Sequence, residues 1–335
     1  MAACATLIHM GQVRVLVLVA VLSVLVACSG AVHPDSARAG PQPVCGWRDS
    51  PPTTYEHVVW IVLENHSYED LIGPRGSTTA ATSPYLNQLA AGCGSATNSW
   101  SVTHPSLPNY LAQLTGGTGG VRTDCTPAQC PQQGRTLLDQ VDRNGGTWRV
   151  LAESMPTPCD RSDSAGYVAR HNVATYFASL SAACHRWDLP MGGATSGRLV
   201  DLVHAGGLPT FLLVVPNQCH STHDCAIGVG DRWLSRVVPL ITSGPDYRAG
   251  RTALFVTWDE GSGGYRGERC ATTRSRSCHV ATIVVTPSTP AGTRAAHRYD
   301  TYALLATTER VLGIPTLLGH AADPATTSMR GAFRF

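Results

Sequence analysis

The chain has 335 residues, of which 43% are hydrophobic and 14% are charged, so it can bury one large core or two small ones. Its formal net charge is +2 and it contains no block of like charge, so its charge gives no indication that it binds nucleic acid. All 25 basic residues are arginine, which excludes Schiff-base chemistry and the lysine of a phosphate-cradling G-x-x-x-x-G-K-[ST] loop. The absence of G-x-S-x-G, H-E-x-x-H and C-x-x-C motifs disfavours an ordinary α/β-hydrolase and the commonest zinc sites.

An apolar run covers residues 11–27, with Arg14 near its start. At about 17 residues it is short for a membrane-spanning helix, and it ends in small residues that suit an export cleavage site. Cys28 directly follows Leu-Val-Ala, which resembles a bacterial lipoprotein box. We therefore expect residues 1–27 to be a signal peptide and Cys28 to carry a lipid that anchors the exported protein to a membrane. An uncleaved anchor and a plain signal peptide are the alternatives.

Residues 28–53 are rich in proline, alanine, glycine and serine, a composition typical of a flexible tether. We expect one domain to follow, over residues 54–335. Ten cysteines lie beyond Cys28, and a large even number in an exported chain indicates disulfide bonds formed in an oxidising compartment. The sequence does not fix their connectivity, but three pairs of sequence neighbours could close short loops: Cys125 with Cys130, Cys219 with Cys225, and Cys270 with Cys278.

Within the domain, apolar strand patterns alternate with helical patterns. In chain order they predict a strand over 57–63, helices over 83–91, 107–114 and 135–143, strands over 147–151 (the weakest) and 211–215, a helix over 232–241, strands over 253–258 and 279–286, and a helix over 302–312. Strands that are apolar almost throughout are buried on both faces, so helices must cover the sheet. The sequence therefore predicts an α/β domain with a doubly wound, mostly parallel sheet covered by helices on both faces.

Polar and ionisable residues follow three of the predicted strands directly. Glu64 and Asn65 come after the first strand, a polar segment over 216–224 follows the strand at 211–215, and Asp259 and Glu260 follow the strand at 253–258. Ligands of an open α/β sheet sit beyond the carboxyl ends of its strands, so we expect these residues to share one site.

The four residues Glu64, Asn65, Asp259 and Glu260 offer only oxygen ligands, which suit Mg²⁺, Ca²⁺ or Mn²⁺ better than zinc. Three carboxylates brought together without a cation would repel one another and raise their pKa values. A divalent cation is the simplest resolution, although each residue taken singly could be a solvated loop residue or a helix cap.

Ser106 lies directly before a predicted helix that has Pro108 in its first turn. Its spacing leaves two interpretations open. The serine can cap the helix. Alternatively, the helix N-terminus binds a phosphate while the hydroxyl attacks phosphorus, once a cation has lowered the pKa of that hydroxyl.

Three histidines, His220, His223 and His279, lie on or beside the strand-end segments. Near a phosphate, such residues donate hydrogen bonds to its oxygens or protonate a leaving group. A structural role is the alternative for each of them.

Taken together, these segments resemble the bacterial phosphoesterase family, which contains acid phosphatases and phosphatidylcholine-type phospholipases C. The matching segments lie in the same order over roughly residues 55–315, at 58–67, 104–110, 215–224, 230–234, 257–261 and 281–285. Several motifs in order are far more specific than any one of them. The short length is most similar to the secreted acid phosphatases of mycobacteria, which are associated with phosphomonoesters that include phosphoinositides.

The family is similar to a branch of the alkaline phosphatase superfamily, so the resemblance implies an alkaline-phosphatase-like fold. There a Pro-Ser/Thr-x-Pro-Asn segment carries the nucleophile, and residues 105–109 match it, which implies that Ser106 is the nucleophile. The resemblance also implies that the metal is bound by Glu64, Asn65, Asp259 and Glu260. It places His104, Asn109, His171, His223 and His279 around the phosphate, and His223 and His279 are the expected proton donors. From its position after the strand at 211–215, we expect His220 to bind the substrate as well.

One segment departs from the family pattern. Where the family has Asn-Asp-x-His-Asp, residues 220–224 read His-Ser-Thr-His-Asp, so Ser221 stands in place of an acid. If that acid serves a second cation, this chain would hold one metal only, and its substrate choice or activity would change.

The sequence therefore favours an exported, metal-assisted phosphomonoesterase that acts through a phosphoserine on phosphate esters, including phosphoinositides or other phosphorylated lipids and metabolites. One alternative is a phospholipase C, a phosphodiesterase acting on membrane lipid. The other is a non-catalytic envelope-binding lipoprotein on a decayed phosphatase fold, for which Ser221 is the only support.

Overall fold

The computed structural model describes residues 43–335. The expected signal peptide, the expected lipidation site Cys28 and the first part of the expected tether lie outside the described residues. Within residues 43–335, no helix is both long enough and apolar enough to cross a membrane.

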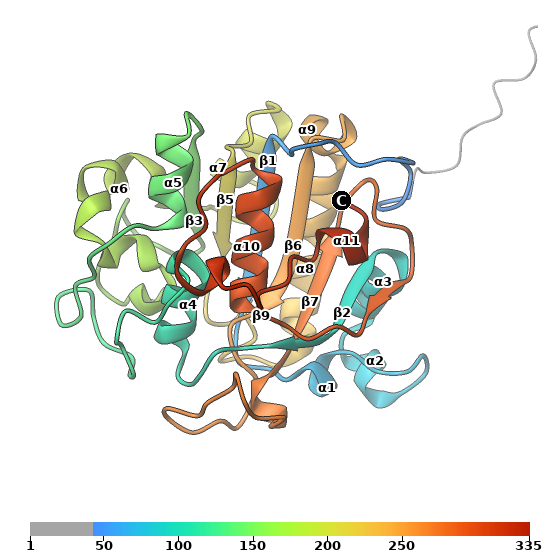
Figure 1. Ribbon diagram of the computed structural model, residues 1–335, viewed down its shortest axis with the longest axis horizontal. Coiled ribbons are helices and arrows are strands. Elements are labelled where there is room, and N and C mark those ends of the chain that lie inside the picture. The colour runs from blue at the N-terminus through green and yellow to red at the C-terminus, as the bar shows by residue number, and fades with distance from the viewer. Residues whose placement is uncertain (1–42) are drawn as a thin grey trace, which may run out of the picture. The chain divides into compact units, whose positions relative to one another are not determined.

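The described residues form one nine-stranded sheet in the order β4-β3-β5-β1-β6-β7-β2-β8, with β9 paired to β2 (Figure 1). Neighbouring strands run parallel from β4 through β6, whereas β7 runs antiparallel to both β6 and β2, so the sheet is mostly parallel as predicted. The strands are β1 (His57–Leu63), β2 (Gly94–Trp100), β3 (Trp148–Ala152), β4 (Asp188–Pro190), β5 (Phe211–Val215), β6 (Thr252–Trp258), β7 (His279–Val285), β8 (Thr293–Ala295) and β9 (Tyr299–Asp300).

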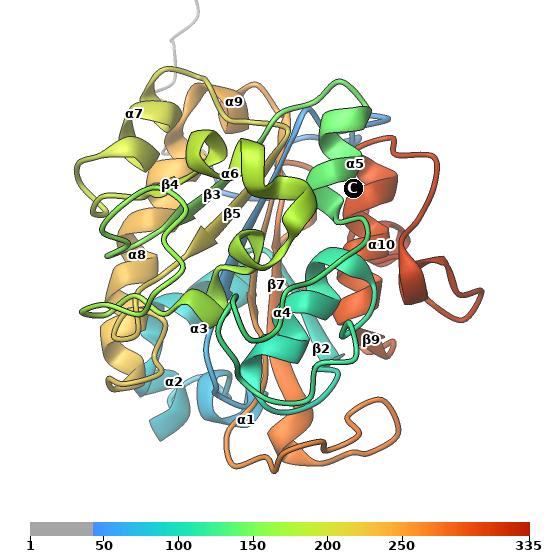
Figure 2. The same cartoon turned by 90° about the vertical axis from the view of Figure 1, so that its left-hand side faces the viewer.

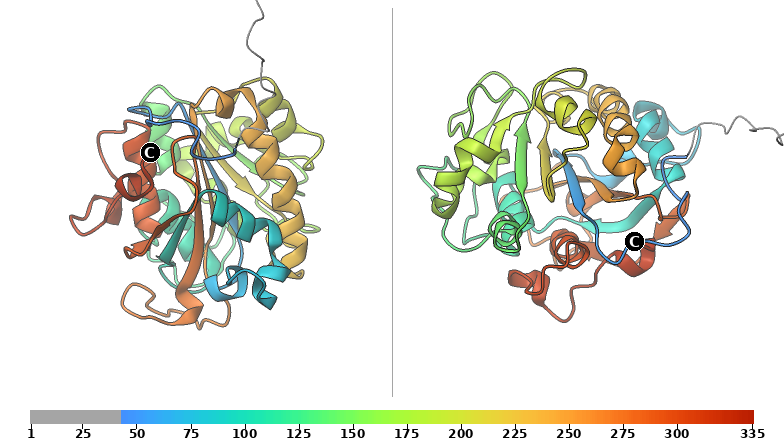
Figure 3. Two further views of the ribbon diagram at one scale, coloured as in Figure 1. Left: turned by 90° about the vertical axis from the view of Figure 1, so that its right-hand side faces the viewer. Right: turned by 90° about the horizontal axis from the view of Figure 1, so that it is seen from above.

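Helices cover both faces of the sheet (Figures 2 and 3). Helices α4, α5 and α10 pack on one face, and α3, α7 and α8 pack on the other. The helices are α1 (Tyr68–Leu71), α2 (Thr78–Thr82), α3 (Pro84–Gly92), α4 (Ser106–Thr115), α5 (Leu137–Arg143), α6 (Ser181–Trp187), α7 (Arg198–His204), α8 (Ile227–Ser243), α9 (Pro245–Arg248), α10 (Thr301–Val311) and α11 (Arg330–Phe333).

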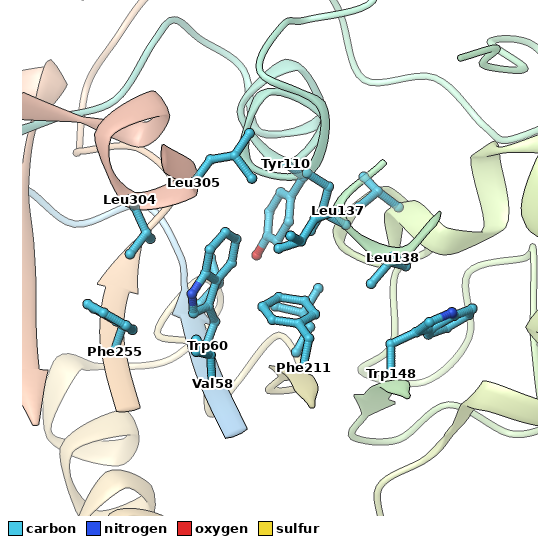
Figure 4. Close-up of a cluster of buried hydrophobic side chains, with 14 of the residues drawn as sticks. Val58, Trp60, Tyr110, Leu137, Leu138, Trp148, Phe211, Phe255, Leu304 and Leu305 are labelled. Carbon is cyan, nitrogen blue, oxygen red and sulfur yellow. The ribbon is translucent and has the colours of Figure 1, made fainter. Parts of the chain in front are cut away.

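Successive side chains of the central strands point to opposite faces of the sheet, so the core lies in two parts, one on each face. In β1, Trp60 points to the face covered by α4, α5 and α10, where its ring meets Phe211 edge-on with 5.0 Å between ring centroids (Figure 4). Its indole N–H donates to Thr308 Oγ1 at 3.0 Å, so the polar atom is satisfied inside the core. The next residue, Ile61, packs on the opposite face with α3 and α8.

All the strands and helices expected from the sequence are present. The largest difference is at α8, which begins at Ile227 rather than at the expected position 232. Strand β2 was not predicted, because its sequence GSATNSW has no apolar alternation. It becomes a strand by pairing with β7 on one side and with β8 and β9 on the other, a tertiary context that overrides local preference.

Five disulfide bonds join the ten cysteines of the described residues, and the three expected pairs are among them. The other two are Cys45–Cys93 and Cys159–Cys184. Cys45 lies within the expected tether, yet it is buried, and the Arg330 guanidinium donates to the carbonyl of Thr53 at 2.6 Å. The later part of the expected tether is therefore attached to the domain through these contacts, which its composition did not indicate.

A buried carboxyl group on α10 gives a test of this core. Glu309 Oε1 accepts the backbone N–H of Leu318 at 2.9 Å, and burial raises the pKa of Glu309 from its ordinary value of 4.5 to about 7. The folded state holds this proton more tightly than the unfolded chain, so stability should fall as pH rises from about 4.5 to about 7. Glu309→Gln keeps a side-chain oxygen that can accept this hydrogen bond, but the side chain no longer titrates. The pH-dependent loss of stability, up to about 3 kcal/mol in the parent, should therefore be absent from the variant. Urea unfolding at a series of pH values measures the free energy of unfolding of both proteins. The same dependence of this free energy on pH in the parent and the variant would contradict the prediction.

Candidate active site

The carboxyl ends of β3, β5, β1 and β6 meet at one edge of the sheet, because these strands run parallel. The register pairs Leu63 at the end of β1 with Trp258 at the end of β6, so Glu64 and Asp259 follow side by side. The segment after β5 joins them, since the Glu64 N–H donates to the Ser221 carbonyl at 2.9 Å. The structure thus brings together the three strand-end segments that were expected to share a site.

Ser106 is the first residue of α4, and Pro105 occupies the capping position before it. Its hydroxyl is buried and donates to Glu64 Oε2 at 3.0 Å. The N–H of the next residue, Leu107, donates to Asp124 Oδ1 at 3.0 Å. A capping serine would stand one position earlier and accept an N–H from its own helix, so this geometry does not support the helix-cap interpretation.

The carboxylates Glu64, Asp259 and Glu260 are buried together, which makes their ionisation costly. Burial raises the pKa of Glu64 to about 8, and the charge of Glu260 adds to that rise. Burial also raises the pKa of Asp259 well above its ordinary value, with further contributions from the charges of Glu64 and Glu260. The cluster therefore carries a free-energy cost that a bound cation would offset.

Several oxygens of this cluster have no hydrogen bond. Both carboxylate oxygens of Asp259 and Oε1 of Glu64 are buried and form no well-oriented hydrogen bond among residues 43–335, although His171 Nε2 lies 3.0 Å from that Glu64 oxygen. Buried polar atoms are normally paired, and bare carboxylate oxygens are the ligands that hard divalent cations prefer. Glu64 and Asp259, with the Ser106 oxygen beside Glu64, therefore fit a cation site.

The other two expected metal ligands are placed differently. Glu260 Oε2 lies 3.1 Å from His104 Nδ1 and accepts a hydrogen bond from Asn109 Nδ2 at 3.1 Å, so this oxygen is already paired. Asn65 has a left-handed φ of 48° and turns the chain directly after β1, with its side chain half-buried.

His171 lies against Glu64. Its Nε2 is 3.0 Å from Glu64 Oε1, and its ring stacks on Tyr110 of α4 with 5.1 Å between ring centroids. Burial, together with the positive charges of Arg170 and His223, lowers the pKa of His171 well below its ordinary value, so the ring is neutral near pH 7. The sequence placed this histidine only by resemblance, and a 3₁₀ helix over Ala169–His171 carries it to the site.

His104 and Asn109 hold the loop before α4. Burial alone would lower the pKa of His104, but its hydrogen bond to Glu260 raises it, which favours an ion pair between them. Asn109 Oδ1 accepts the backbone N–H groups of Val102 and Thr103 at 3.0 and 3.1 Å. Both were expected around the phosphate, which stays a prediction; the contacts seen here shape the loop that presents the serine and orient Glu260.

His223 lies near the cluster, whereas His279 makes no contact with it. The ring centroids of His223 and His171 are 6.1 Å apart. His279 begins β7, and its Nδ1 lies 2.7 Å from Glu69 Oε1 while its Nε2 pairs with the Thr97 carbonyl at 3.1 Å. Both ring nitrogens of His279 are engaged toward α1 and β2, so its geometry does not support the prediction that it is a proton donor.

Glu153 follows β3 and was not among the expected site residues. It is buried, its Oε2 lies 2.8 Å from His220 Nδ1, and its Oε1 accepts the indole N–H of Trp233 at 3.3 Å. Glu153 also accepts the Asn217 N–H at 3.2 Å, so it holds both His220 and the segment after β5. An acid just beyond the predicted strand at 147–151 is the same signal that identified Glu64 and Asp259.

Ser221, which replaces the acid of the family pattern, is buried and serves its own loop. Its hydroxyl donates to the Gln218 carbonyl at 3.2 Å. The next residue, Thr222, has a left-handed φ of 77° and donates its hydroxyl to the Glu64 carbonyl at 3.0 Å. Together with the Cys219–Cys225 disulfide, these bonds fix the backbone beside Glu64.

A comparison with protein families agrees with this geometry. Residues 76–315 match the family described as Phosphoesterase family, which is most of the chain. The chain belongs to the Phosphoesterase family.

Relatives of this phosphoesterase carry phosphatase names. It is 29% identical to the phosphatidylinositol-3-phosphatase of Mycobacterium tuberculosis over 296 residues, 87% of this chain and 88% of that protein. It is 26% identical to an acid phosphatase of Aspergillus fumigatus over 295 residues, 84% of this chain but only 60% of that longer protein. The protein is therefore a phosphoric ester hydrolase, and the non-catalytic alternative finds no support.

Solved structures with a similar fold confirm the predicted fold class. One is a protein of the alkaline phosphatase superfamily from Vibrio parahaemolyticus, with a TM-score of 0.54, 11% identity, and coverage of 85% of this chain and 74% of that one. Another is the C-terminal periplasmic domain of EcEptC from Escherichia coli, with a TM-score of 0.50, 12% identity, and coverage of 85% and 89%. At these identities the likeness concerns the fold alone.

The buried carboxylates of the phosphoesterase give a second prediction. Asp259→Asn removes one of the ionisable groups whose burial is unfavourable, so in the presence of a chelator the variant should be more stable than the parent by about 1 kcal/mol. Turnover of p-nitrophenyl phosphate should fall by at least about 100-fold. Thermal unfolding in EDTA and initial rates measure the two effects.

The matched control is Asp246→Asn, at a buried carboxylate that pairs with Arg251. It should lose stability and keep its activity. A destabilised Asp259→Asn variant would contradict the idea that Asp259 is held in an unfavourable state.

Proposed function

We propose that the protein is an exported, metal-assisted phosphomonoesterase in which Ser106 forms a phosphoserine intermediate. The observation that carries this proposal is the position of Ser106. Its hydroxyl donates to Glu64 at 3.0 Å, at the start of α4 and beside Asp259, whose two buried oxygens lack hydrogen-bond partners in residues 43–335. A serine with only a structural role does not require buried carboxylates beside its hydroxyl.

Ser106 supplies the nucleophile in the first step. Its Oγ forms a bond to phosphorus, the bond between phosphorus and the leaving oxygen breaks, and the hydroxyl proton leaves along the hydrogen bond to Glu64. Water then attacks the phosphoserine, which restores Ser106 and releases inorganic phosphate. The positive end of the α4 dipole favours the negative charge on the phosphate in both steps.

The cation would be held by Glu64 and Asp259, with Ser106 Oγ beside them. A bound divalent cation supplies positive charge and Lewis acidity for cleavage of the ester. The oxygen-only donor set suits Mg²⁺, Ca²⁺ or Mn²⁺ better than zinc. The commitment of the Ser221 hydroxyl to the Gln218 carbonyl supports a single cation rather than two.

His223 is the histidine best suited to assist the leaving group. Its Nδ1 lies 2.6 Å from Asp224 Oδ1, which holds a proton on that nitrogen and leaves Nε2 for the substrate. In the imidazolium form, Nε2 gives its proton to the leaving oxygen. His171, which is neutral and lies against Glu64, keeps that carboxylate in place.

Phosphorylated lipids or related metabolites are the proposed substrates. The Mycobacterium tuberculosis relative is named for a phosphatidylinositol 3-phosphate activity, which supports phosphoinositides as one class. Five disulfide bonds support an oxidising compartment outside the cytoplasm. A lipid on Cys28, which lies outside the described residues, remains part of the proposal.

Replacement of the nucleophile tests the first step. Ser106→Ala should lower turnover of p-nitrophenyl phosphate by at least about 1,000-fold, because no residue would then carry the phosphoryl group. Its melting temperature should stay close to that of the parent. Ser288→Ala, which removes a buried hydroxyl far from Glu64 in the sequence, is the control and should keep full activity. Undiminished turnover in Ser106→Ala would remove Ser106 from the scheme.

A substrate panel separates the phosphomonoesterase from a phospholipase C. Phosphatidylinositol 3-phosphate and p-nitrophenyl phosphate should both yield inorganic phosphate, and phosphatidylcholine should yield almost no phosphocholine. EDTA should abolish turnover, and added Mg²⁺, Ca²⁺ or Mn²⁺ should restore it. Faster release of phosphocholine than of phosphate would favour the phospholipase, while activity indifferent to EDTA would exclude the cation.

A further inference from the structure

The segment between β6 and β7, residues 261–278, projects past the edge of the sheet that carries the active site. Figures 1 and 2 show it in orange at the bottom of the molecule, below the carboxyl ends of the parallel strands. The Cys270–Cys278 disulfide closes the second half of this segment. We call the whole segment, residues 261–278, the arginine loop. Neither the proposed mechanism nor the core uses its exposed residues.

The arginine loop is bonded to the chain just before the nucleophile. The Gly267 N–H donates to the His104 carbonyl at 2.9 Å, and the Cys270 N–H donates to the Val102 carbonyl at 3.1 Å. The His104 ring pairs through Nε2 with the Ser277 carbonyl at 3.0 Å. Gly264 lies so close to this ring that a Cβ atom there would sit 2.1 Å from Nε2. The loop therefore has a fixed position next to the active site.

All the exposed charges of the arginine loop are positive. The side chains of Arg266, Arg269, Arg274 and Arg276 are exposed, whereas its one acid, Glu268, is buried. Glu268 accepts the Ser277 hydroxyl at 2.8 Å, inside the loop. Four exposed arginines within eleven residues stand out in a chain whose formal net charge is only +2.

Three of these arginines are available to a partner. Arg276 pairs with Asp70 of α1, which attaches that side of the loop to the domain. The other three, Arg266, Arg269 and Arg274, make no ion pair with any residue in the part of the chain that the structure describes. Arg274 also lies near Arg298, whose pKa is lowered by burial and by this neighbouring positive charge. Exposed cations without an ion-pair partner on one short segment favour an anionic partner.

The arginine loop also carries an exposed aromatic ring. Tyr265 is 68% exposed, and among residues 43–335 it is the one large hydrophobic side chain left in this state. A tyrosine ring with an apolar body and a polar hydroxyl suits the headgroup layer of a bilayer, where tyrosine and tryptophan are enriched. Arginines beside it add attraction to anionic lipid.

We propose that the arginine loop docks the enzyme on an anionic phospholipid surface, with Tyr265 in the headgroup layer and Arg266, Arg269 and Arg274 against the lipid phosphates. Because the loop is bonded to His104, docking sets the active edge against the membrane and presents Ser106 to headgroup phosphate esters. The gain in turnover of lipid substrates rests on the proposed function; the binding itself does not. The exposed tyrosine among the arginines favours a lipid surface over a nucleic acid.

Vesicle binding tests the proposal on the full chain. All proteins carry Cys28→Ser, so residues 1–42 contribute equally and no lipid is attached at that position. The loop variant combines Arg266→Gln, Arg269→Gln and Arg274→Gln. The control combines Arg135→Gln, Arg143→Gln and Arg236→Gln, which are also exposed and remove the same charge elsewhere. Binding is measured by co-sedimentation with vesicles of phosphatidylcholine alone and of equal parts phosphatidylcholine and phosphatidylinositol.

The parent and the control should prefer the anionic vesicles, and the loop variant should bind them about 100-fold more weakly, since each arginine near such a surface contributes about five-fold. Tyr265→Ser should weaken binding to both kinds of vesicle. The loop variant, the control and Tyr265→Ser should all turn over soluble p-nitrophenyl phosphate at the parental rate. The loop variant alone among the arginine variants should lose activity on phosphatidylinositol 3-phosphate presented in vesicles.

Equal vesicle binding by the loop variant and the control would overturn the proposal. So would arginine-dependent binding of a duplex oligonucleotide without binding of anionic vesicles. Sedimentation needs no turnover, so this result is independent of the Ser106→Ala experiment. Failure of the docking surface and failure of the proposed function can therefore be told apart.

Discussion

The active edge of this protein depends on the burial of two carboxylates beside each other. The register of β1 and β6 places Glu64 and Asp259 next to one another, and both are completely buried. Such a pair is unfavourable by itself, because burial and mutual repulsion raise both pKa values. Rigid strands that hold carboxylate oxygens without hydrogen-bond partners in place would also preorganise the proposed cation site, and stability is commonly sacrificed for such a site.

The residues around this pair restrain it from several directions. Thr222 fixes the backbone of Glu64, and His171 lies against its carboxylate. His104 and Asn109 together hold Glu260. These groups come from α4 and from the loops after β5, before α4 and beyond β3, and the Cys219–Cys225 disulfide limits the motion of the segment that carries Thr222. A supporting layer of this kind keeps catalytic groups within the narrow geometry that their chemistry needs.

The same supporting layer connects the site to the surface of the molecule. His104 contacts Glu260 on one side and the Ser277 carbonyl of the arginine loop on the other. A surface that approaches this loop therefore approaches the start of α4 at a fixed distance. For the proposed lipid substrates, this arrangement would couple substrate recognition to the orientation of the enzyme, without any movement of the proposed catalytic groups.

The sequence alone determined the central strands, because strands buried on both faces need contiguous apolar residues, and β1, β5 and β6 have them. It also predicted that Ser106, Glu64 and Asp259 would share a site, since these residues adjoin predicted elements and follow the order of a family pattern, and the structure brings them together. Only the tertiary structure decided that His279 turns toward Glu69, that Asn109 and His104 hold a loop, and that Glu153 orients His220. These contacts join residues far apart in the chain, so they depend on strand register and loop path, which no local pattern encodes.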